Sequence, residues 1–190
     1  GLPQGGIRFG ASMNPDAVID QGYQFDFYDG GGLDLAYLGL AECDEKGNIN
    51  VSRFGPKIAG CGGFINITQN TPKVFFCGTF TAGGLKVKVE DGKVIIAQEG
   101  REKKFIKKVG QITFNGDVAL KNKQQVMYIT ERCVFELKED GLHLTEIAPG
   151  IDLQTQILDV MEFEPKIDRV NGEIKLMDAR LFSEALMGLK

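Results

Sequence analysis

Short apolar runs separated by turns of glycine and polar residues make up most of the chain, and this pattern predicts an α/β protein with many short strands. The run at 74–78 is apolar on both faces, as a central strand of a parallel sheet tends to be. Residues 33–42 predict a second strand. Turns are predicted at 44–48 and at Gly55-Pro56, with a short strand at 49–51 between them.

Two further segments have the alternation and the tight turns of β-hairpins. The segment 85–96 reverses at Asp91-Gly92, a dipeptide typical of two-residue hairpin turns. The segment 134–147 reverses at 139–141 in the same way. Both segments are therefore predicted to be hairpins.

Helices are predicted at three places. An asparagine followed by a proline predicts a helix over 14–20, and helical spacing of apolar residues predicts two more over 151–161 and 178–189. Residues 25–28 predict a strand instead. Residues 64–67 fit either a short helix or an extended segment, and their periodicity does not decide between the two.

Composition describes a soluble globular chain and excludes several classes of function. The 190 residues carry 22 Lys and Arg against 26 Asp and Glu, a net charge of −4, and are 43% hydrophobic, which excludes disorder, a coiled coil and a collagen-like fibre. The acidic balance gives no domain-wide reason to bind nucleic acid or an anionic membrane. No apolar run reaches the roughly 18 residues that span a bilayer, and no signal peptide opens the chain. We therefore expect a single cytoplasmic domain over 1–190.

Cysteine and histidine are too sparse to build a metal site or a familiar nucleophile. The four cysteines stand far apart and never form a CxxC pair, which excludes a disulfide framework and a zinc site. His143 is the single histidine and lies in an alternating stretch, so it is interpreted as a solvent-facing strand residue and not as part of a catalytic triad.

Glycine is the unusual residue, at 25 of 190 against a usual share of about 7%. Clusters at 30–32, 60–63 and 83–84 each flank an apolar run, where backbone N–H groups can approach a ligand closely. Together with Gly5-Gly6 these clusters suggest a floor of backbone donors for a thioester oxyanion or a carboxylate. The cluster at 60–63 lacks the GxGxxG spacing of a dinucleotide-binding fold.

Charged clusters have simpler interpretations. A basic run could contact phosphates but is interpreted as a solvated face; it consists of Arg101, Lys103, Lys104, Lys107 and Lys108. Three aspartates around the first glycine cluster do not match a calcium loop and are interpreted as turn residues; they are Asp26, Asp29 and Asp34.

The order of these motifs resembles the β-subunit half of family I coenzyme A transferases. The matching stretches are Gly30-Gly31-Gly32-Leu33-Asp34, Gly47-Asn48-Ile49-Asn50-Val51, Gly60-Cys61-Gly62-Gly63, Tyr128-Ile129-Thr130-Glu131-Arg132-Cys133 and Gly141 to Gly150. Phe25-Asp26-Phe27-Tyr28 and Gly78 to Gly83 resemble the branch of fused transferases that act on short-chain acyl-CoA with acetate or acetoacetate. The resemblance covers essentially the whole chain. It implies an open, mixed and largely parallel sheet with flanking helices and hairpins.

The resemblance also implies a ping-pong reaction in which a glutamate attacks the acyl-CoA thioester and becomes a glutamyl-CoA thioester. Coenzyme A is then a substrate, and no permanently bound cofactor or metal is expected. In the family this glutamate lies just before the stretch that matches Gly1 to Gly6, so we expect it upstream of Gly1. The chain is then the C-terminal portion of a larger enzyme, inactive alone and partnered by an α-like half. A homo-oligomer is expected from the family as well.

The resemblance assigns roles to nine residues. Asn48 aligns with the asparagine that orients the glutamate, although a turn asparagine tolerating positive φ is the alternative. Three glycine clusters are implied to contact the substrate. Gly30, Gly31 and Gly32 would border the acyl pocket. Gly60, Gly62 and Gly63 would lie beside the thioester carbonyl, and Gly83 and Gly84 would line the CoA entry path. Thioester hydrolysis and non-catalytic binding of a small molecule remain the alternative functions.

Overall fold

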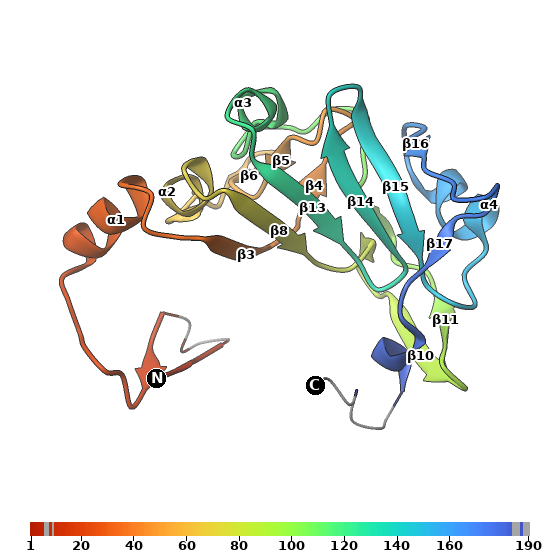
Figure 1. Cartoon of the computed structure of the whole chain (residues 1–190), viewed down its shortest axis with the longest axis horizontal. Coiled ribbons are helices and arrows are strands. Elements are labelled where there is room, and N and C mark those ends of the chain that lie inside the picture. Colours follow the sequence, from red (N-terminus) through yellow and green to blue (C-terminus); the bar gives the residue numbers. More distant parts are fainter. Residues whose placement is uncertain (6–7, 9, 184–186, 188–190) are drawn as a thin grey trace.

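A computed structural model of the chain describes residues 1–190 except 6–7, 9, 184–186 and 188–190. In this described part, seven strands form the main sheet, in the order β16-β15-β14-β13-β8-β3, and β17 also pairs with β15 (Figure 1). Their bounds are β3 Leu35–Gly39, β8 Lys73–Cys77, β13 Gln125–Ile129, β14 Cys133–Lys138, β15 Gly141–Ile147, β16 Lys166–Ile167 and β17 Lys175–Leu176.

Two-stranded pairs and short helices surround the main sheet. The paired strands are β1 (Leu2–Pro3) with β2 (Ser12–Met13), β4 (Glu42–Cys43) with β5 (Ile49–Asn50), β6 (Arg53–Phe54) with β7 (Lys57–Ile58), β9 (Thr81–Ala82) with β12 (Glu102–Lys103), and β10 (Lys86–Glu90) with β11 (Lys93–Gln98). The helices are α1 (Gln21–Asp29), α2 (Phe64–Gln69), α3 (Gly116–Lys121) and α4 (Leu153–Gln156), with 3₁₀ turns η2 (Leu158–Val160) and η3 (Ala179–Phe182).

The sheet is mixed, as predicted. Strands β3, β8 and β13 are parallel, whereas β14 pairs antiparallel with both β13 and β15. Because the three parallel strands are in register, their carboxyl ends lie at one edge of the sheet, at Gly39, Cys77 and Ile129. In open α/β sheets this edge is the usual place for a ligand.

One face of the sheet is packed with aromatic side chains and the other is open. Phe76 lies 4.9 Å from Phe114 between ring centroids, and Phe105 lies 5.0 Å from Phe135. These rings are buried in one hydrophobic core. On the opposite face near the β3 edge, Tyr37 stays exposed although its ring stacks on a neighbouring strand.

The first predicted helix is wrong in position, and so is the strand predicted over 25–28. Residues 14–20 form no helix, and Asn14 has a positive φ of 47° instead of the extended conformation of an N-cap residue. The helix α1 begins instead after Asp20, whose Oδ1 accepts a hydrogen bond from the N–H of Gly22 at 2.9 Å. A capping residue six positions further along the chain therefore decides where the helix starts.

The two predicted C-terminal helices are shorter than their apolar periodicity suggests. Helix α4 covers four residues and is followed by the 3₁₀ turn η2, because Ile157 leaves the helical region with φ −124° and ψ −68°. Over 178–189 the structure shows the 3₁₀ turn η3, and residues 184–186 and 188–189 of that prediction lie outside the described part.

The turn prediction is wrong for Asp26 and Asp29, which lie in helix α1, whereas the predictions of the central strand and of the two hairpins are confirmed. Strand β8 lies between two parallel neighbours, and both hairpins form, as β10–β11 and β14–β15. The ambiguous segment at 64–67 is helical, as part of α2. Among the described residues, no helix is long and apolar enough to cross a membrane.

Candidate active site

Asn48 is buried in the turn between β4 and β5, with its side-chain amide engaged at both ends. Its Nδ2 donates to Asp44 Oδ2 at 3.1 Å, and its Oδ1 accepts from the N–H of Gly116 at 2.9 Å. The positive φ of this turn belongs to Gly47 and not to Asn48. The amide retains one N–H and one acceptor lone pair for a further partner.

Asp44 makes this turn rigid. Its Oδ1 accepts from the backbone N–H groups of Lys46 and Asn48, each at 3.1 Å, and its Oδ2 accepts from Val109 N–H at 3.3 Å as well as from Asn48. A buried carboxylate with four donors is satisfied without a metal or a counter-ion. Asn48 is therefore a fixed group, held before any substrate arrives.

A cavity of about 480 Å³ lies against this turn. Asn48 and Asp44 form part of its wall, and Lys107 and Lys108 come from the segment that follows β12. The volume is within the usual range of small-molecule pockets, about 300–1,000 Å³. Three lysines (Lys46, Lys107 and Lys108) and three acids (Asp44, Glu45 and Asp117) line the cavity, so its charges balance and do not by themselves select an anionic ligand.

Asn50 is a site-forming residue that sequence reasoning missed. Its side chain is fully buried; Nδ2 donates to Glu42 Oε2 at 2.7 Å and to Arg53 O at 2.6 Å, and Oδ1 accepts from Ser52 N–H at 3.0 Å. The carbonyl of Ser52 in turn accepts from Gly60 N–H at 3.0 Å. Asn50 thus links the β5 strand to the glycine loop. The signal in the sequence was an amide between two apolar residues of a short strand.

The loop at 60–63 adopts conformations that need glycine at two positions. Gly60 and Gly62 have φ of 81° and 52°, and an added Cβ would meet no other atom within 4 Å at either position. Backbone conformation alone therefore selects glycine at these two positions. At Gly63, by contrast, φ is negative and an added Cβ would lie 2.6 Å from the ring of Phe25.

The N–H groups of this loop are not equivalent. That of Gly60 is engaged with Ser52, whereas those of Gly62 and Gly63 make no backbone hydrogen bond within the described residues. Of the three predicted donors, only Gly62 and Gly63 have an N–H group available to a ligand carbonyl.

The cluster at Gly30, Gly31 and Gly32 ends helix α1. All three N–H groups donate to carbonyls of the last turns of that helix, at 2.9 to 3.0 Å. Asp29 then joins α1 to α2, because its carboxylate accepts from Asn66 Nδ2 at 2.9 Å. The structure therefore brings this cluster near the helix that follows Gly63, but with no backbone donor left for a ligand.

Gly83 and Gly84 lie elsewhere. They follow β9, beyond the carboxyl end of β8, whereas Gly32 precedes the amino end of β3. Five residues of strand span about 17 Å, so these two clusters are separated by the length of the parallel strands. A single floor formed by all the glycine clusters is not present in the described chain, and each cluster is a separate candidate.

A buried ionic network at the carboxyl edge of the sheet was missed as well. Arg132 is fully buried; its Nη1 and Nη2 contact the two carboxylate oxygens of Glu99 at 2.7 and 3.1 Å, and its Nε contacts Glu131 Oε1 at 2.6 Å. Burial alone would lower the pKa of Arg132, but the hydrogen bonds that it donates to both carboxylates raise it. The guanidinium is therefore a permanent charge inside the protein.

Lys104 corrects the interpretation of the basic run. The other members are not buried, but Lys104 is 7% exposed and its Nζ donates to Thr79 O at 2.6 Å. Burial lowers the pKa of Lys104, against the attraction of Glu131. One lysine of the predicted solvated face is thus part of the interior at the carboxyl edge.

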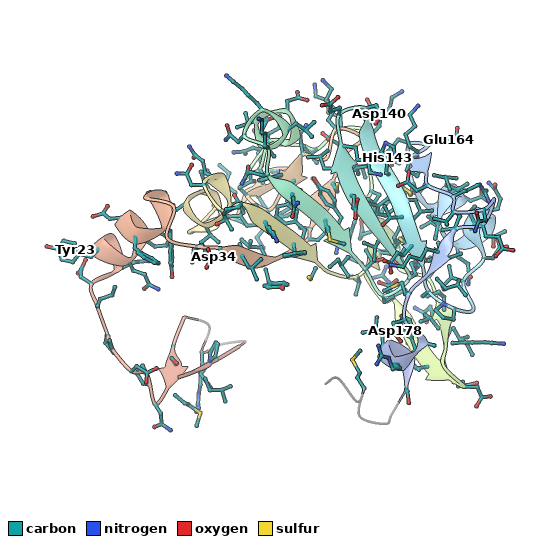
Figure 2. The ribbon with its side chains drawn as sticks, viewed as in Figure 1. Tyr23, Asp34, Asp140, His143, Glu164 and Asp178 are labelled. Atoms are coloured by element: carbon teal, nitrogen blue, oxygen red, sulfur yellow. The ribbon has the colours of Figure 1, made fainter. Side chains whose placement is uncertain are left out.

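His143 lies on strand β15, as predicted, but it is not free in solvent. Its Nδ1 lies 2.8 Å from Asp168 Oδ1 and its Nε2 lies 2.7 Å from Asp140 Oδ1. Figure 2 shows Asp140 and His143 together at the end of the β14–β15 hairpin, far from Tyr23 on α1. This cluster is remote from the glycine clusters along the sheet.

Metal and thiol chemistry receive no support from the described residues. No group of three His, Cys, Asp or Glu side chains within them could hold a metal ion, and all four cysteines are free there. Burial, with a smaller contribution from Asp44, raises the pKa of Cys43 well above its ordinary value, and burial raises the pKa of Cys77. Neither thiol is prepared as a nucleophile.

Two curated relatives cover nearly the whole chain. This chain is 56% identical over 188 residues to the acetate CoA-transferase YdiF of Escherichia coli. It is 53% identical over 194 residues to a caffeate CoA-transferase of Acetobacterium woodii. The chain spans about a third of their length, 35% and 36%. No protein-family model matches it. At this level of identity the chain is homologous to that third of the coenzyme A transferases, the family that its motifs resemble.

Solved structures agree with this assignment. The acyl-CoA transferase YdiF of E. coli O157:H7, in its apoenzyme form, matches all of this chain at 56% identity with a TM-score of 0.90, over 36% of its own length. A second structure of that protein is a thioester complex with CoA. The decarboxylase AibA/AibB matches 88% of the chain at 20% identity and a TM-score of 0.62, which shows a shared fold only.

Proposed function

We propose that the full-length protein transfers coenzyme A between a short-chain acyl-CoA and a carboxylic acid, acetate or a 3-oxoacid. The observation that carries this proposal is the 56% identity to YdiF over almost the whole chain, together with the CoA thioester complex of that relative. Acyl-CoA and short carboxylic acids are then its substrates. The enzyme is proposed to act in the cytoplasm.

The reaction is proposed to run through a glutamate upstream of Gly1. Its carboxylate attacks the thioester carbonyl and expels the CoA thiolate, leaving an acyl-glutamyl anhydride. The thiolate then attacks the glutamyl carbonyl of that anhydride, which releases the first carboxylate and leaves a glutamyl-CoA thioester. An incoming carboxylate reverses these steps, so that the new acyl-CoA forms and the glutamate is regenerated.

Asn48 is proposed to orient that glutamate with the part of its amide that remains available. Its contacts to Asp44 and to the N–H of Gly116 fix the amide plane, so the remaining N–H points in one direction. Gly62 and Gly63 are proposed to stabilise the carbonyl oxygen of the thioester, because their N–H groups are not engaged by the described backbone. Gly60 is proposed to allow the positive φ that the loop needs at this position and not to bind the substrate.

The other glycines are proposed to shape the substrate path without donating to it. Gly30, Gly31 and Gly32 end α1 beside the acyl pocket, and Gly83 and Gly84 line the entry of CoA. An α-like half of the same enzyme is proposed to cover the open face of the sheet, where Leu35 and Tyr37 are exposed on β3. Residues 1–190 are proposed to form one β-like domain of this larger homo-oligomeric enzyme.

A transfer assay of the full-length protein tests the function. Acetyl-CoA and a labelled short carboxylic acid should exchange CoA with parallel initial-rate lines, as in a ping-pong reaction. After incubation with acyl-CoA and borohydride, mass spectrometry should find the modified glutamate on a peptide N-terminal to Gly1. Free CoA that accumulates faster than new acyl-CoA would identify a hydrolase. Absence of exchange with every short acid would favour a non-catalytic binding protein.

A substitution tests the glycine loop. Gly63→Val should lower turnover about 10²-fold or more, the size expected on losing an oxyanion donor. Since the new side chain would also meet the ring of Phe25, the double variant Gly63→Val with Phe25→Ala is the matched control. If the double variant regains normal turnover, the loss is steric and Gly63 is not a donor.

A further inference from the structure

The segment 78–84 joins the carboxyl end of β8 to the two glycines at 83–84, and side chains from three other segments hold it. Phe80 N–H donates to Glu131 Oε2 at 2.8 Å, and Thr79 O accepts from Lys104 Nζ at 2.6 Å. Thr81 Oγ1 donates to Glu99 Oε1. Three consecutive residues of this segment, 79–81, are thus each hydrogen-bonded to a charged side chain.

Arg132 connects these ties. It bonds Glu99 through both terminal nitrogens and Glu131 through Nε, and its guanidinium lies 4.8 Å above the ring of Phe80. A further bond from Nη1 reaches Gln156 O at 2.9 Å. Four of the five guanidinium N–H groups are therefore used, as a planar, forked donor allows.

An ionic network at this place is not required for stability alone. A buried guanidinium between two carboxylates loses its hydration, and well-packed apolar residues of similar volume are often as stable or more stable. What the network supplies is orientation, because Glu131 holds the backbone N–H of Phe80 and Glu99 holds the side-chain hydroxyl of Thr81. Residues 79–81 are thereby placed by hydrogen bonds and not only by packing.

The order imposed on 79–81 extends to the two glycines. Ala82 pairs with Glu102 in the β9–β12 ladder, and the carbonyl of Gly83 accepts from Arg101 N–H at 3.3 Å. A Cβ at Gly100 would overlap the carbonyl oxygen of Ala82, so the two segments approach as closely as glycine allows. Gly83 and Gly84 then turn with φ of 76° and 105°.

We propose that Arg132, Glu99 and Glu131 act as positioning residues that hold the segment 78–84 in the conformation that binds coenzyme A. The inference rests on the proposed transferase function, in which Gly83 and Gly84 line the path of CoA. None of the three side chains is a catalytic residue, because each acts through this segment: Glu131 through Phe80 N–H, Glu99 through the Thr81 hydroxyl and Arg132 through both glutamates.

Kinetics of the full-length enzyme test the proposal. Glu99→Gln keeps the shape of the side chain but removes its charge, and Glu139→Gln in the exposed β14–β15 turn is the matched control. Glu99→Gln should raise KM for acyl-CoA about fivefold or more, leave kcat within about twofold and leave KM for the acid unchanged. The control should change none of these values. An unchanged KM for acyl-CoA, or a fall in kcat alone, would overturn the proposal.

Hydrogen exchange provides a second measurement on the same full-length variants, with Glu131→Gln as the alternative if Glu99→Gln does not fold. Amides of 78–84 should exchange faster in the variant, whereas those of β13 should not change. Unchanged exchange over 78–84 would overturn the positioning role even if KM rises. If the wild-type enzyme shows no CoA transfer, the proposed function fails, and exchange still decides whether the network orders this segment.

Discussion

Two ionic clusters on opposite parts of the sheet use the same chemistry in different surroundings. At the carboxyl edge, Arg132 is fully buried between Glu99 and Glu131. At the end of the β14–β15 hairpin, His143 lies between Asp140 and Asp168, whose side chains are 62% and 36% exposed. Each cluster places one basic side chain between two carboxylates.

The clusters differ in burial at the basic side chain and at one carboxylate: Arg132 is 0% exposed and Glu131 17%, whereas Glu99 at 35% is as exposed as Asp168 at 36%. They differ little in geometry. Donor to acceptor distances are 2.6 to 3.1 Å in the first cluster and 2.7 to 2.8 Å in the second. Water screens the exposed carboxylates around His143, so their ion pairs contribute little to the free energy of unfolding. Removing Arg132 from the buried network, by contrast, leaves uncompensated charge. Burial should therefore decide which cluster the fold depends on.

The largest effect is expected for Arg132→Met. It would leave Glu99 and Glu131 without their cation and should lower the free energy of unfolding by about 3–5 kcal/mol, measured by urea denaturation. Replacing the two glutamates at the same time by glutamine should restore a large part of that loss, because no unpaired charge then remains. A loss below about 1 kcal/mol for Arg132→Met would remove the contrast between the two clusters.

Asn48→Ala tests whether burial matters when the side chain is neutral. The substitution removes one of the two donors to Asp44 Oδ2 and the acceptor of Gly116 N–H in a buried turn, and an unsatisfied buried group costs about 1–3 kcal/mol. Urea denaturation should show a loss in that range, between those of the two ionic clusters. Asn48→Asp keeps an acceptor for Gly116 N–H but adds a negative charge beside Asp44. This variant should therefore be no more stable than Asn48→Ala. If Asn48→Ala is as stable as wild type, the turn does not depend on the amide.

Local pattern predicted the parts of the fold that local forces determine. The hairpin β10–β11 followed from Asp91-Gly92, whose φ values of 50° and 72° suit a tight turn, and β8 followed from its apolar run. Helix α1 was missed because two capping residues compete for its start, and only the folded chain selects Asp20 over Asn14.

The candidate site was predictable only in part. The role of the glycine loop at 60–63 was predicted from the family resemblance and stays a prediction; the structure adds that the N–H groups of Gly62 and Gly63 make no backbone hydrogen bond within the described residues. Arg132 and Glu99 were not identifiable because isolated charges 33 positions apart look like surface residues until the fold brings them together. Asn50 was missed for a similar reason, since its partners come from different turns.

Acidic pH should weaken both clusters through their carboxylates. Burial would raise the pKa of Glu99, but the hydrogen bonds from Arg132 and Thr81 lower it below 4.5; the hydrogen bond from His143, with Lys138, lowers the pKa of Asp168 below 3.8. A carboxyl whose pKa is lower when folded stabilises the protein above its unfolded pKa, and that stability is lost as pH falls through the folded pKa.

The free energy of unfolding, measured against pH, should therefore begin to fall near pH 4.5 for the part due to Glu99 and near pH 3.8 for the part due to Asp168. Glu99→Gln should flatten the first part, and Asp168→Asn the second. Both parts should be smaller than the effect of Arg132→Met, since the two carboxylates are partly exposed. An identical pH profile in Glu99→Gln and wild type would show that Glu99 is not perturbed by the network.

The smallest effect is expected for His143→Ala. It removes both contacts of the exposed cluster, yet Asp140 and Asp168 are then hydrated and Lys138 still lies 2.6 Å from Asp168 Oδ2. The free energy of unfolding should fall by no more than about 1 kcal/mol, and the loss should shrink further in high salt, which screens exposed charges. Lys175→Ala is the matched control, because it breaks the surface ion pair with Glu146, which lies on β15 like His143. Its loss of unfolding free energy should be equally small and equally sensitive to salt. A salt-independent loss of more than about 2 kcal/mol for His143→Ala would exceed the usual contribution of an exposed pair. Solvent exposure would then not be what separates the two clusters.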